Sequence, residues 1–162
     1  MPQPGVSLVE VYPFRFHENR IEYLLLKRAP HDRLYPGIWQ IVTGTIEKGE
    51  TAVQAALREV SEETLLKPLK FWVLPDTASF YDHRNDLVQF CVLFSCQLPD
   101  GKEPTLSEEH DAWLWCSAQA AKPLVAWPSQ RDHIDLVERT IVRGDQSGDL
   151  LDISGESFGQ DP

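Results

Sequence analysis

The 162-residue chain has little of what several classes of protein require. Its longest unbroken apolar runs are five residues, such as residues 90–94, which is far short of a membrane span. Its first residues do not show a positively charged segment followed by an apolar one, so no signal peptide is expected. These absences predict a soluble cytoplasmic protein without a membrane partner.

Cysteine is scarce and lacks the spacing of a metal site or of a disulfide framework. Cys91, Cys96 and Cys116 form an odd set with no CxxC pair. Two of them lie in strand-like apolar sequence, where a free cysteine usually serves as a small buried hydrophobe. The five histidines show no HxxxH or HExxH spacing. Neither residue type therefore predicts a zinc site.

Positive charge is also in short supply. Asp plus Glu number 25 and Lys plus Arg number 15, which gives a net charge of −10. A nonspecific grip on a nucleic-acid backbone needs clustered cations, so we expect no nucleic-acid partner. A small phosphorylated substrate stays compatible with this charge, because a bound metal ion can reverse it locally.

What the chain does have is an alternation of strand and helix patterns, which its length confines to one domain. The order of these patterns predicts an α/β or α+β sandwich around a mixed sheet. Branched and aromatic residues predict a hairpin formed by residues 6–14 and 21–28. The further expected strands are 38–43, 70–80, 87–98 and 112–116, and the expected helices are 51–64, 118–122 and one opening at Ser129.

The clearest helix signal in the chain begins at Thr51. Thr51 can cap the helix, and Gln54 three residues later completes a capping-box pattern. Apolar residues then recur at i, i+3, i+4 and i+7 from Val53 to Val60, which gives one apolar face. Pro68 ends any continuation.

The last part of the chain differs in composition from the rest. After Arg143 there are five acidic residues and no basic one. This composition predicts a flexible acidic tail over residues 144–162, so residues 1–143 are expected to form the single domain.

The helix that begins after Thr51 carries an unusual set of carboxylates. At 100° per residue, Glu59 and Glu63 lie one turn apart with Glu62 beside them. Like charges at i,i+4 repel by on the order of 0.2–0.5 kcal/mol, and a divalent cation between them would remove that cost. Hard oxygen ligands suit Mg²⁺ or Mn²⁺ rather than zinc. The helix alone leaves a second interpretation open, because most such charge runs are solvated helix faces.

The residues before the helix favour the cation. Gly44 is followed by five residues and Glu50, and then by seven residues and the run Arg-Glu-Val-Ser-Glu-Glu-Thr-Leu-Leu at 58–66. This spacing resembles the Nudix box, G-x5-E-x7-R-E-U-x-E-E-x-G-U with U aliphatic, and eight of its nine specified positions match. The ninth is Leu65, at the helix end where glycine normally supplies a left-handed cap. The departure concerns the exit of the helix rather than the ligands.

The resemblance implies the Nudix-type α/β/α sandwich and a hydrolase that depends on Mg²⁺, or on Mn²⁺ in its place. It implies Glu59 and Glu63 as the main metal ligands. Glu62 would contribute to a ligand or to a water molecule. Arg58 would hold a carboxylate by a charge-assisted hydrogen bond.

The resemblance also implies contributions from outside the helix. The backbone carbonyl of Thr43 or Gly44 would add an oxygen ligand, and Glu50 would steady the junction of loop and helix. Family members often bring a further carboxylate from a loop beyond the box, as a base or as another ligand. Glu109 fits this position, although Glu108-Glu109 is also an ordinary polar turn.

Residues that flank the box narrow the resemblance. Residues 39–52, the pair Glu109-His110, Trp115 and residues 127–131 resemble the subgroup of dATP pyrophosphohydrolases and dihydroneopterin triphosphate pyrophosphatases. This subgroup implies hydrolysis of a nucleoside triphosphate-like substrate to a monophosphate and pyrophosphate.

Residues that would bind such a substrate are harder to single out. An ordinary surface or core role is the alternative for each of them. The candidate phosphate-binding cations are Lys27, Arg28, Arg33 and Arg84, and the aromatic residues that could stack on a base or pterin are Trp39, Phe80, Tyr81 and Trp127.

Two other functions stay open. Tyr81 follows Leu65 by 16 residues, a spacing that accompanies some dinucleoside polyphosphate hydrolases of the same family. A Nudix fold kept as a non-catalytic binding module is the second alternative, and Leu65 and the missing Pro-Gly-Gly run before the box are its only support. The sequence leaves open whether the protein is a monomer or a homodimer.

Overall fold

A computed structural model describes residues 1–144 and 146–158, which form a mixed sheet with helices on both faces. The sheet has seven strands in the order β3-β2-β1-β6-β5, while β4 pairs with β1 and β7 pairs with β2. Strands β1 and β6 run parallel and the other pairs are antiparallel. The strands are β1 (Gln3–His17), β2 (Arg20–Arg28), β3 (Trp39–Gln40), β4 (Val42–Thr45), β5 (Lys70–Asp82), β6 (Leu87–Gln97) and β7 (His110–Cys116).

Among the described residues, one helix lies between β4 and β5 and the others follow β7. None of them is both long and apolar enough to cross a membrane. They are α1 (Ala52–Thr64), α2 (Ala118–Leu124), α3 (Pro128–Val137), the π-helix η1 (Glu138–Val142), α4 (Gln146–Leu151) and α5 (Ser154–Ser157).

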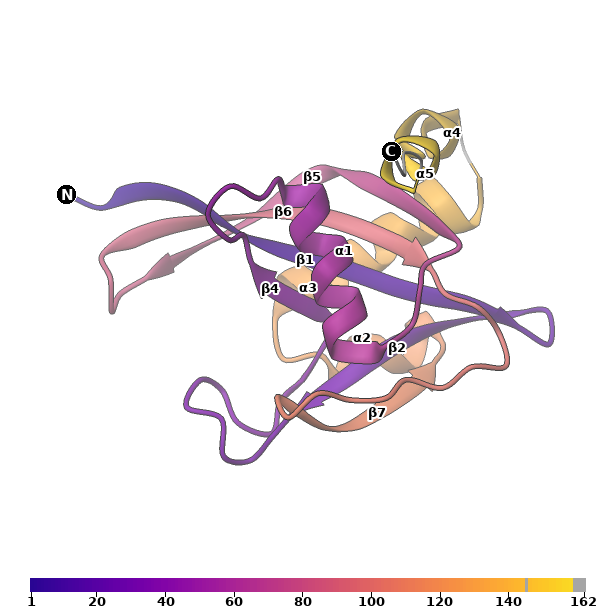
Figure 1. Cartoon of the computed structure of the whole chain (residues 1–162), viewed down its shortest axis with the longest axis horizontal. Helices are drawn as coiled ribbons and strands as arrows, with labels where there is room; N and C mark the ends of the chain where they lie inside the picture. The colour runs from indigo at the N-terminus through magenta and orange to yellow at the C-terminus, as the bar shows by residue number, and fades with distance from the viewer. Residues whose placement is uncertain (145, 159–162) are drawn as a thin grey trace.

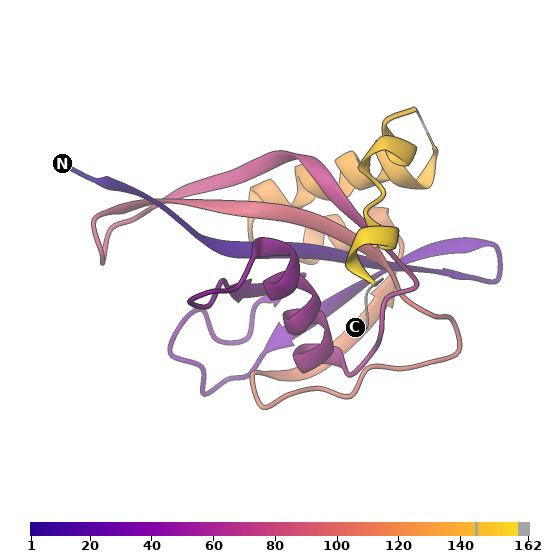
Figure 2. The same ribbon diagram turned by 45° about the horizontal axis from the view of Figure 1, so that its top comes forward.

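The sheet separates two apolar cores. Helix α1 covers one face and helices α2 and α3 cover the other (Figures 1 and 2). Because side chains alternate along a strand, β1 serves both layers: Val9 and Val11 pack in the core under α1, whereas Tyr12 and Phe14 pack in the core under α3. This arrangement confirms the predicted α/β/α sandwich with a mixed sheet.

The local signals at the first hairpin and at α1 are confirmed. Strands β1 and β2 pair up to His17 opposite Arg20, with positive φ at both residues of the turn between them. Thr51 caps α1, and Gln54 completes the capping box by accepting a hydrogen bond from the Thr51 backbone N–H at 2.9 Å.

Two predicted boundaries were wrong. The strand expected over 38–43 is broken at Ile41, because β3 pairs with β2 while β4 crosses to pair with β1. Helix α3 begins at Pro128 rather than after a Ser129 cap, and its cap residue Trp127 makes no side-chain hydrogen bond. Proline suits the first helical position, since the backbone N–H that it lacks would have no partner there.

The structure also differs from the expected flexible tail. Residues 146–158 fold against β5: the Ile153 backbone N–H donates to the Phe71 carbonyl at 2.9 Å, and the Phe71 N–H donates to Ser154 Oγ at 2.9 Å. Leu151 and Ile153 pack against the two apolar cores. The acidic composition gave no indication that Leu151 and Ile153 pack against the cores. The packed part of the chain therefore extends past residue 143. Residues 145 and 159–162 of the expected tail lie outside the described residues.

The three cysteines are free, as their spacing predicted. Cys91 and Cys96 are buried in the two cores. Burial raises the pKa of the Cys91 thiol to about 12, so it stays neutral and acts as a small apolar group.

The exit of α1 explains how leucine replaces the glycine of the box. Leu65 adopts φ 55° and ψ 18°, the left-handed conformation that glycine supplies elsewhere. Its backbone N–H donates to the Ser61 carbonyl at 2.9 Å, and 67% of the residue surface is exposed. The chain therefore keeps the geometry of the box and carries the strain of a side chain there.

We expect Leu65→Gly to raise the free energy of unfolding by about 0.5–1 kcal/mol. The substitution removes a left-handed strain of about 1–2 kcal/mol, loses little packing, and is offset in part by the greater freedom of glycine in the unfolded chain. Urea denaturation measures the change. Ser61→Gly, at an exposed right-handed position, is the control and should destabilise by roughly 0.5 kcal/mol. Equal losses in both variants would contradict a left-handed exit.

Candidate functional site

Arg58 joins the loop before α1 to the acidic face of the helix. Its Nε and one terminal nitrogen donate to the two Glu50 oxygens at 2.9 and 3.0 Å. The other terminal nitrogen donates to Glu59 Oε1 at 2.8 Å and to Glu62 Oε2 at 3.3 Å. A further hydrogen bond of 2.8 Å reaches the Thr45 carbonyl at the end of β4. The structure thus gathers three carboxylates of the motif, those of Glu50, Glu59 and Glu62, around the Arg58 guanidinium.

Gly44 is a glycine because the Glu59 carboxylate lies against it. A Cβ atom on Gly44 would stand 1.9 Å from Glu59 Cδ and 2.1 Å from its Oε1. Real Cβ atoms do not approach so closely, so a side chain at this position on β4 has to displace the carboxylate. The structure therefore brings the predicted residues Gly44 and Glu59 into direct contact, with Thr43 next to them on the same strand.

Glu63 lies deeper, in a second group of potential ligands. It is 2% exposed, and its Oε2 atom is buried without a hydrogen-bond partner within residues 1–144 and 146–158. One ligand atom each from Glu63, Glu109 and His110 lie within 4.8 Å of one another. Glu109 is exposed, and the backbone around it is fixed because the Ala29 N–H donates to its carbonyl at 2.8 Å. Glu59 and Glu62 are not members of this group.

A positive charge would stabilise the carboxylates of both groups, Glu63 in one and Glu59 in the other. Burial raises the pKa of Glu63 well above its usual value, and the negative charges of Glu59 and Glu109 raise it further, while Arg28 lowers it. Burial also raises the pKa of Glu59, against the effect of Arg58. A buried carboxylate oxygen without a partner is costly. The donor set of carboxylates and an imidazole fits a divalent cation, which would supply both the charge and the missing partner.

His110 is the site residue whose role the sequence did not reveal. It is 4% exposed, and both of its ring nitrogens are buried without a hydrogen-bond partner among the residues that the structure describes. Burial, together with Arg28, lowers its pKa to about 4. The only signal in the sequence was its position next to Glu109, since the histidines show no ligand spacing.

The predicted substrate residues lie in three different places. Arg28 lies beside the carboxylates. It pairs with His110 across β2 and β7, and its charge lowers the pKa of Glu63. Its side chain is half-buried and hydrogen-bonded to Asp32. Lys27 precedes it on β2, opposite Trp39 on β3.

Trp39 packs as a core residue. It is half-buried against the core under α2 and α3, and its carbonyl accepts a hydrogen bond from the Ala126 N–H at 3.2 Å. These contacts match the core alternative stated for this side chain.

Tyr81 and Arg84 belong to the β5–β6 hairpin, which projects beyond α1 toward the N-terminal end of the sheet (Figure 1). The Tyr81 hydroxyl donates to Asp86 Oδ1 at 2.9 Å within the same hairpin. The Arg84 guanidinium lies 5.8 Å from the ring centroid of Tyr35, and that ring meets Trp127 edge-on at 4.8 Å. The structure therefore places Arg84 over the Tyr35 ring, which in turn contacts Trp127.

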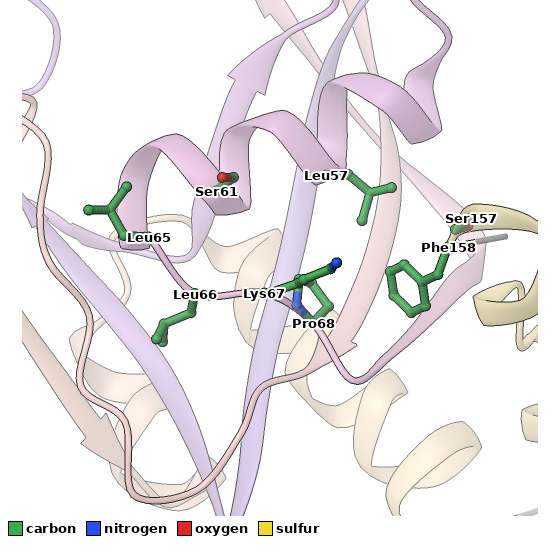
Figure 3. A pocket seen from close by; sticks show the side chains of 8 residues that line it. All are labelled: Leu57, Ser61, Leu65, Leu66, Lys67, Pro68, Ser157 and Phe158. Carbon is green, nitrogen blue, oxygen red and sulfur yellow. The ribbon is translucent and has the colours of Figure 1, made fainter. Parts of the chain in front are cut away.

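Two surface grooves lie near the C-terminal end of α1. One groove is lined by Leu57 and Ser61 of α1, by residues 65–68 and by Ser157 and Phe158 (Figure 3). Leu57 is two residues, or about 200° of helix rotation, from Glu59. This groove is therefore separate from the carboxylate groups.

Comparison with known proteins identifies the family to which the chain belongs. The family model described as "NUDIX domain" matches residues 1–137. The dihydroneopterin triphosphate diphosphatase of Escherichia coli K12 is 33% identical over 149 residues, which cover 82% of this chain and 91% of the relative. The solved structure of the E. coli dihydroneopterin triphosphate pyrophosphohydrolase superposes with a TM-score of 0.64 at 28% identity. The superposition covers 89% of this chain and 100% of that structure's chain.

A third similarity concerns the fold alone. An Ap4A hydrolase of C. elegans superposes with a TM-score of 0.69 at 21% identity, over 81% of this chain and 93% of that one. The match of the family model over most of the chain, and the relative aligned over nearly its whole length, identify the family. The chain belongs to the Nudix family and is a hydrolase.

Proposed function

We propose that this Nudix hydrolase uses Mg²⁺ or Mn²⁺ to cleave a nucleoside triphosphate-like substrate into a monophosphate and pyrophosphate. The candidate substrates are dATP, other nucleoside triphosphates and dihydroneopterin triphosphate. The observation that carries the proposal is the group formed by the buried Glu63 and His110 with the exposed Glu109, whose ligand atoms lie within 4.8 Å of one another. The charge of Glu59 also acts on Glu63. The similarity to an enzyme named for dihydroneopterin triphosphate supports the substrate class.

Three carboxylates would hold the cation. Glu59 and Glu63 come from α1, and Glu109 comes from the loop before β7; the carbonyl of Thr43 or Gly44 would add a backbone oxygen. When bound, the cation neutralises charge on the phosphate oxygens and lowers the pKa of a bound water molecule.

The remaining charged residues have supporting parts in the reaction. Arg58 holds Glu59 in position before substrate arrives, which reduces the cost of organising the site. Glu62 is exposed, which suits a carboxylate that orients the attacking water. Arg28 would bind a phosphate oxygen, because it pairs with His110 in the sheet and its charge acts on Glu63.

The site gives less support to the two alternatives, a binding module and a dinucleoside polyphosphate hydrolase. A binding module without catalysis has no need of a buried and mutually repelling set of carboxylates, which the chain keeps complete. A dinucleoside polyphosphate hydrolase would use Tyr81 against a base; this ring is 55% exposed, but its hydroxyl is engaged by Asp86. Hydrolysis of a triphosphate substrate is therefore the function that the site supports best.

Product analysis over a substrate panel tests the proposal. The panel holds dihydroneopterin triphosphate, dATP, the other nucleoside triphosphates, diadenosine tetraphosphate and ADP-ribose, each with Mg²⁺ and with Mn²⁺. We expect pyrophosphate and a monophosphate from the pterin or from dATP. Glu63→Gln should lower turnover by at least about 10³-fold, the order of loss expected when stabilisation of the developing charge is removed.

The controls separate the possible results. Glu108→Gln changes the neighbouring exposed carboxylate and should keep the activity of the parent protein. Preference for the dinucleotide would move the function to the Tyr81 alternative. Tight substrate binding by folded, metal-loaded protein with no product over hours would contradict hydrolysis and support the binding module.

We expect Gly44→Ala to weaken metal binding and to lower kcat/KM by about 10²-fold, because the new Cβ displaces the Glu59 carboxylate by an ångström or more. Calorimetric titration with Mn²⁺ and initial rates measure the two effects, and circular dichroism checks the fold. Gly155→Ala is the matched control, since its Cβ would meet nothing within 4 Å. Unchanged metal affinity in folded Gly44→Ala protein would remove Glu59 from the ligand set.

A further inference from the structure

We propose that His110 supplies a nitrogen ligand to the cation held by Glu63 and Glu109, and that this ligand makes the site bind Mn²⁺ more tightly than Mg²⁺. The inference rests on the metal site of the proposed function, and it goes beyond the carboxylate and carbonyl ligands that the Nudix box implies.

The first argument is the isolation of the imidazole. His110 is 4% exposed, and neither of its ring nitrogens has a hydrogen-bond partner in the part of the chain that the structure describes. Burying a polar nitrogen without a partner costs on the order of 1–3 kcal/mol, so buried histidines normally keep at least one hydrogen bond. The Glu63 Oε2 atom is unpartnered in the same way. One cation bound by Glu63 Oε2 and by one of the two ring nitrogens would give both of those atoms a partner.

The second argument is distance. One atom each of His110, Glu63 and Glu109 lie within 4.8 Å of one another. An octahedral ion with bonds of about 2.1–2.2 Å separates opposite ligands by about 4.3 Å and adjacent ones by about 3 Å. The three groups are therefore within small side-chain rotations of sharing one ion.

The third argument is the independent support of the ligands. Glu63 comes from α1, whereas His110 begins β7 and pairs with Arg28 of β2. Its backbone N–H donates to the Ser107 carbonyl at 3.3 Å, and the neighbouring Glu109 carbonyl accepts from Ala29 at 2.8 Å. Both sides of the site are thus fixed by backbone hydrogen bonds before an ion binds.

The ligand type determines the preferred metal. Mg²⁺ takes oxygen ligands and keeps several waters, whereas imidazole nitrogen is an ordinary ligand of first-row transition ions. Adding one such nitrogen to a carboxylate site raises the affinity for Mn²⁺ relative to Mg²⁺. Mn²⁺ would then be the better occupant of this site rather than a substitute.

Pulsed electron paramagnetic resonance of Mn²⁺ bound to the metal-free protein tests the inference directly. In wild-type protein we expect modulation from one coupled ¹⁴N nucleus, replaced by the ¹⁵N pattern when histidine alone is ¹⁵N-labelled. His110→Gln should abolish the coupling and weaken Mn²⁺ binding by about 10-fold or more, with a change of less than about 3-fold for Mg²⁺. His83→Gln, at an exposed histidine of the β5–β6 hairpin, should change neither quantity.

Each outcome decides between the two proposals. Bound Mn²⁺ without nitrogen coupling in wild-type protein overturns the role of His110 and leaves the proposed function standing. Folded protein that binds neither Mn²⁺ nor Mg²⁺ overturns both. Should His110→Gln fail to fold, the same spectra of Gln variants at His17, His31, His83 and His133 decide: retained coupling in all four supports His110, and its loss in any one overturns it.

Discussion

The burial of the Glu63 carboxylate is the constraint on which the site depends. The side chain lies on the inner face of α1, among residues such as Ala56 and Val60 that build an ordinary apolar core. Its unpartnered oxygen and its negative neighbours make this position costly in a protein without a bound cation. A helix selected only for stability would carry an apolar residue here. The cost is recovered when a divalent ion supplies the missing charge, which links the stability of α1 to the chemistry of the site.

The fold holds the ligands from three directions. Helix α1 offers Glu59 and Glu63, the end of β4 lies against Glu59 through Gly44, and the loop before β7 brings Glu109 and His110. Arg58 connects the first two by bonding both the helix carboxylates and the carbonyl of Thr45. Because β4 and β7 pair with the adjacent strands β1 and β2, the central sheet sets the spacing of all three. Helices α2 and α3 on the far face contribute none of these ligands.

Local patterns in the sequence were sufficient for the box helix, its capping box at Thr51 and the mixed sandwich, because each follows from neighbours along the chain. The departure at Leu65 left the geometry of the helix exit open, and only the structure shows that leucine adopts the left-handed conformation there. Other features depend on contacts between distant segments. The reason for Gly44 becomes visible only when Glu59 packs on it, and the isolation of His110 depends on the register of β7 against β2. The folding of residues 146–158 escaped prediction because a few apolar contacts outweigh an acidic composition.

Thermal denaturation of wild-type protein and Glu63→Gln, with and without Mn²⁺, tests the link between the buried carboxylate and the cation most directly. Folding raises the pKa of Glu63, so its penalty is absent below the unfolded-state value of about 4.3 and grows as the pH rises from there through the folded-state pKa. In chelator at pH 8 we expect Glu63→Gln to melt at a higher temperature than wild type, with the difference shrinking as the pH falls toward 4.3. Mn²⁺ at about 100 times its Kd should raise the wild-type Tm by about 5–10 °C and that of the variant far less. A variant that is less stable at pH 8 without metal, or a wild-type Tm that does not respond to Mn²⁺ or Mg²⁺, would contradict the account.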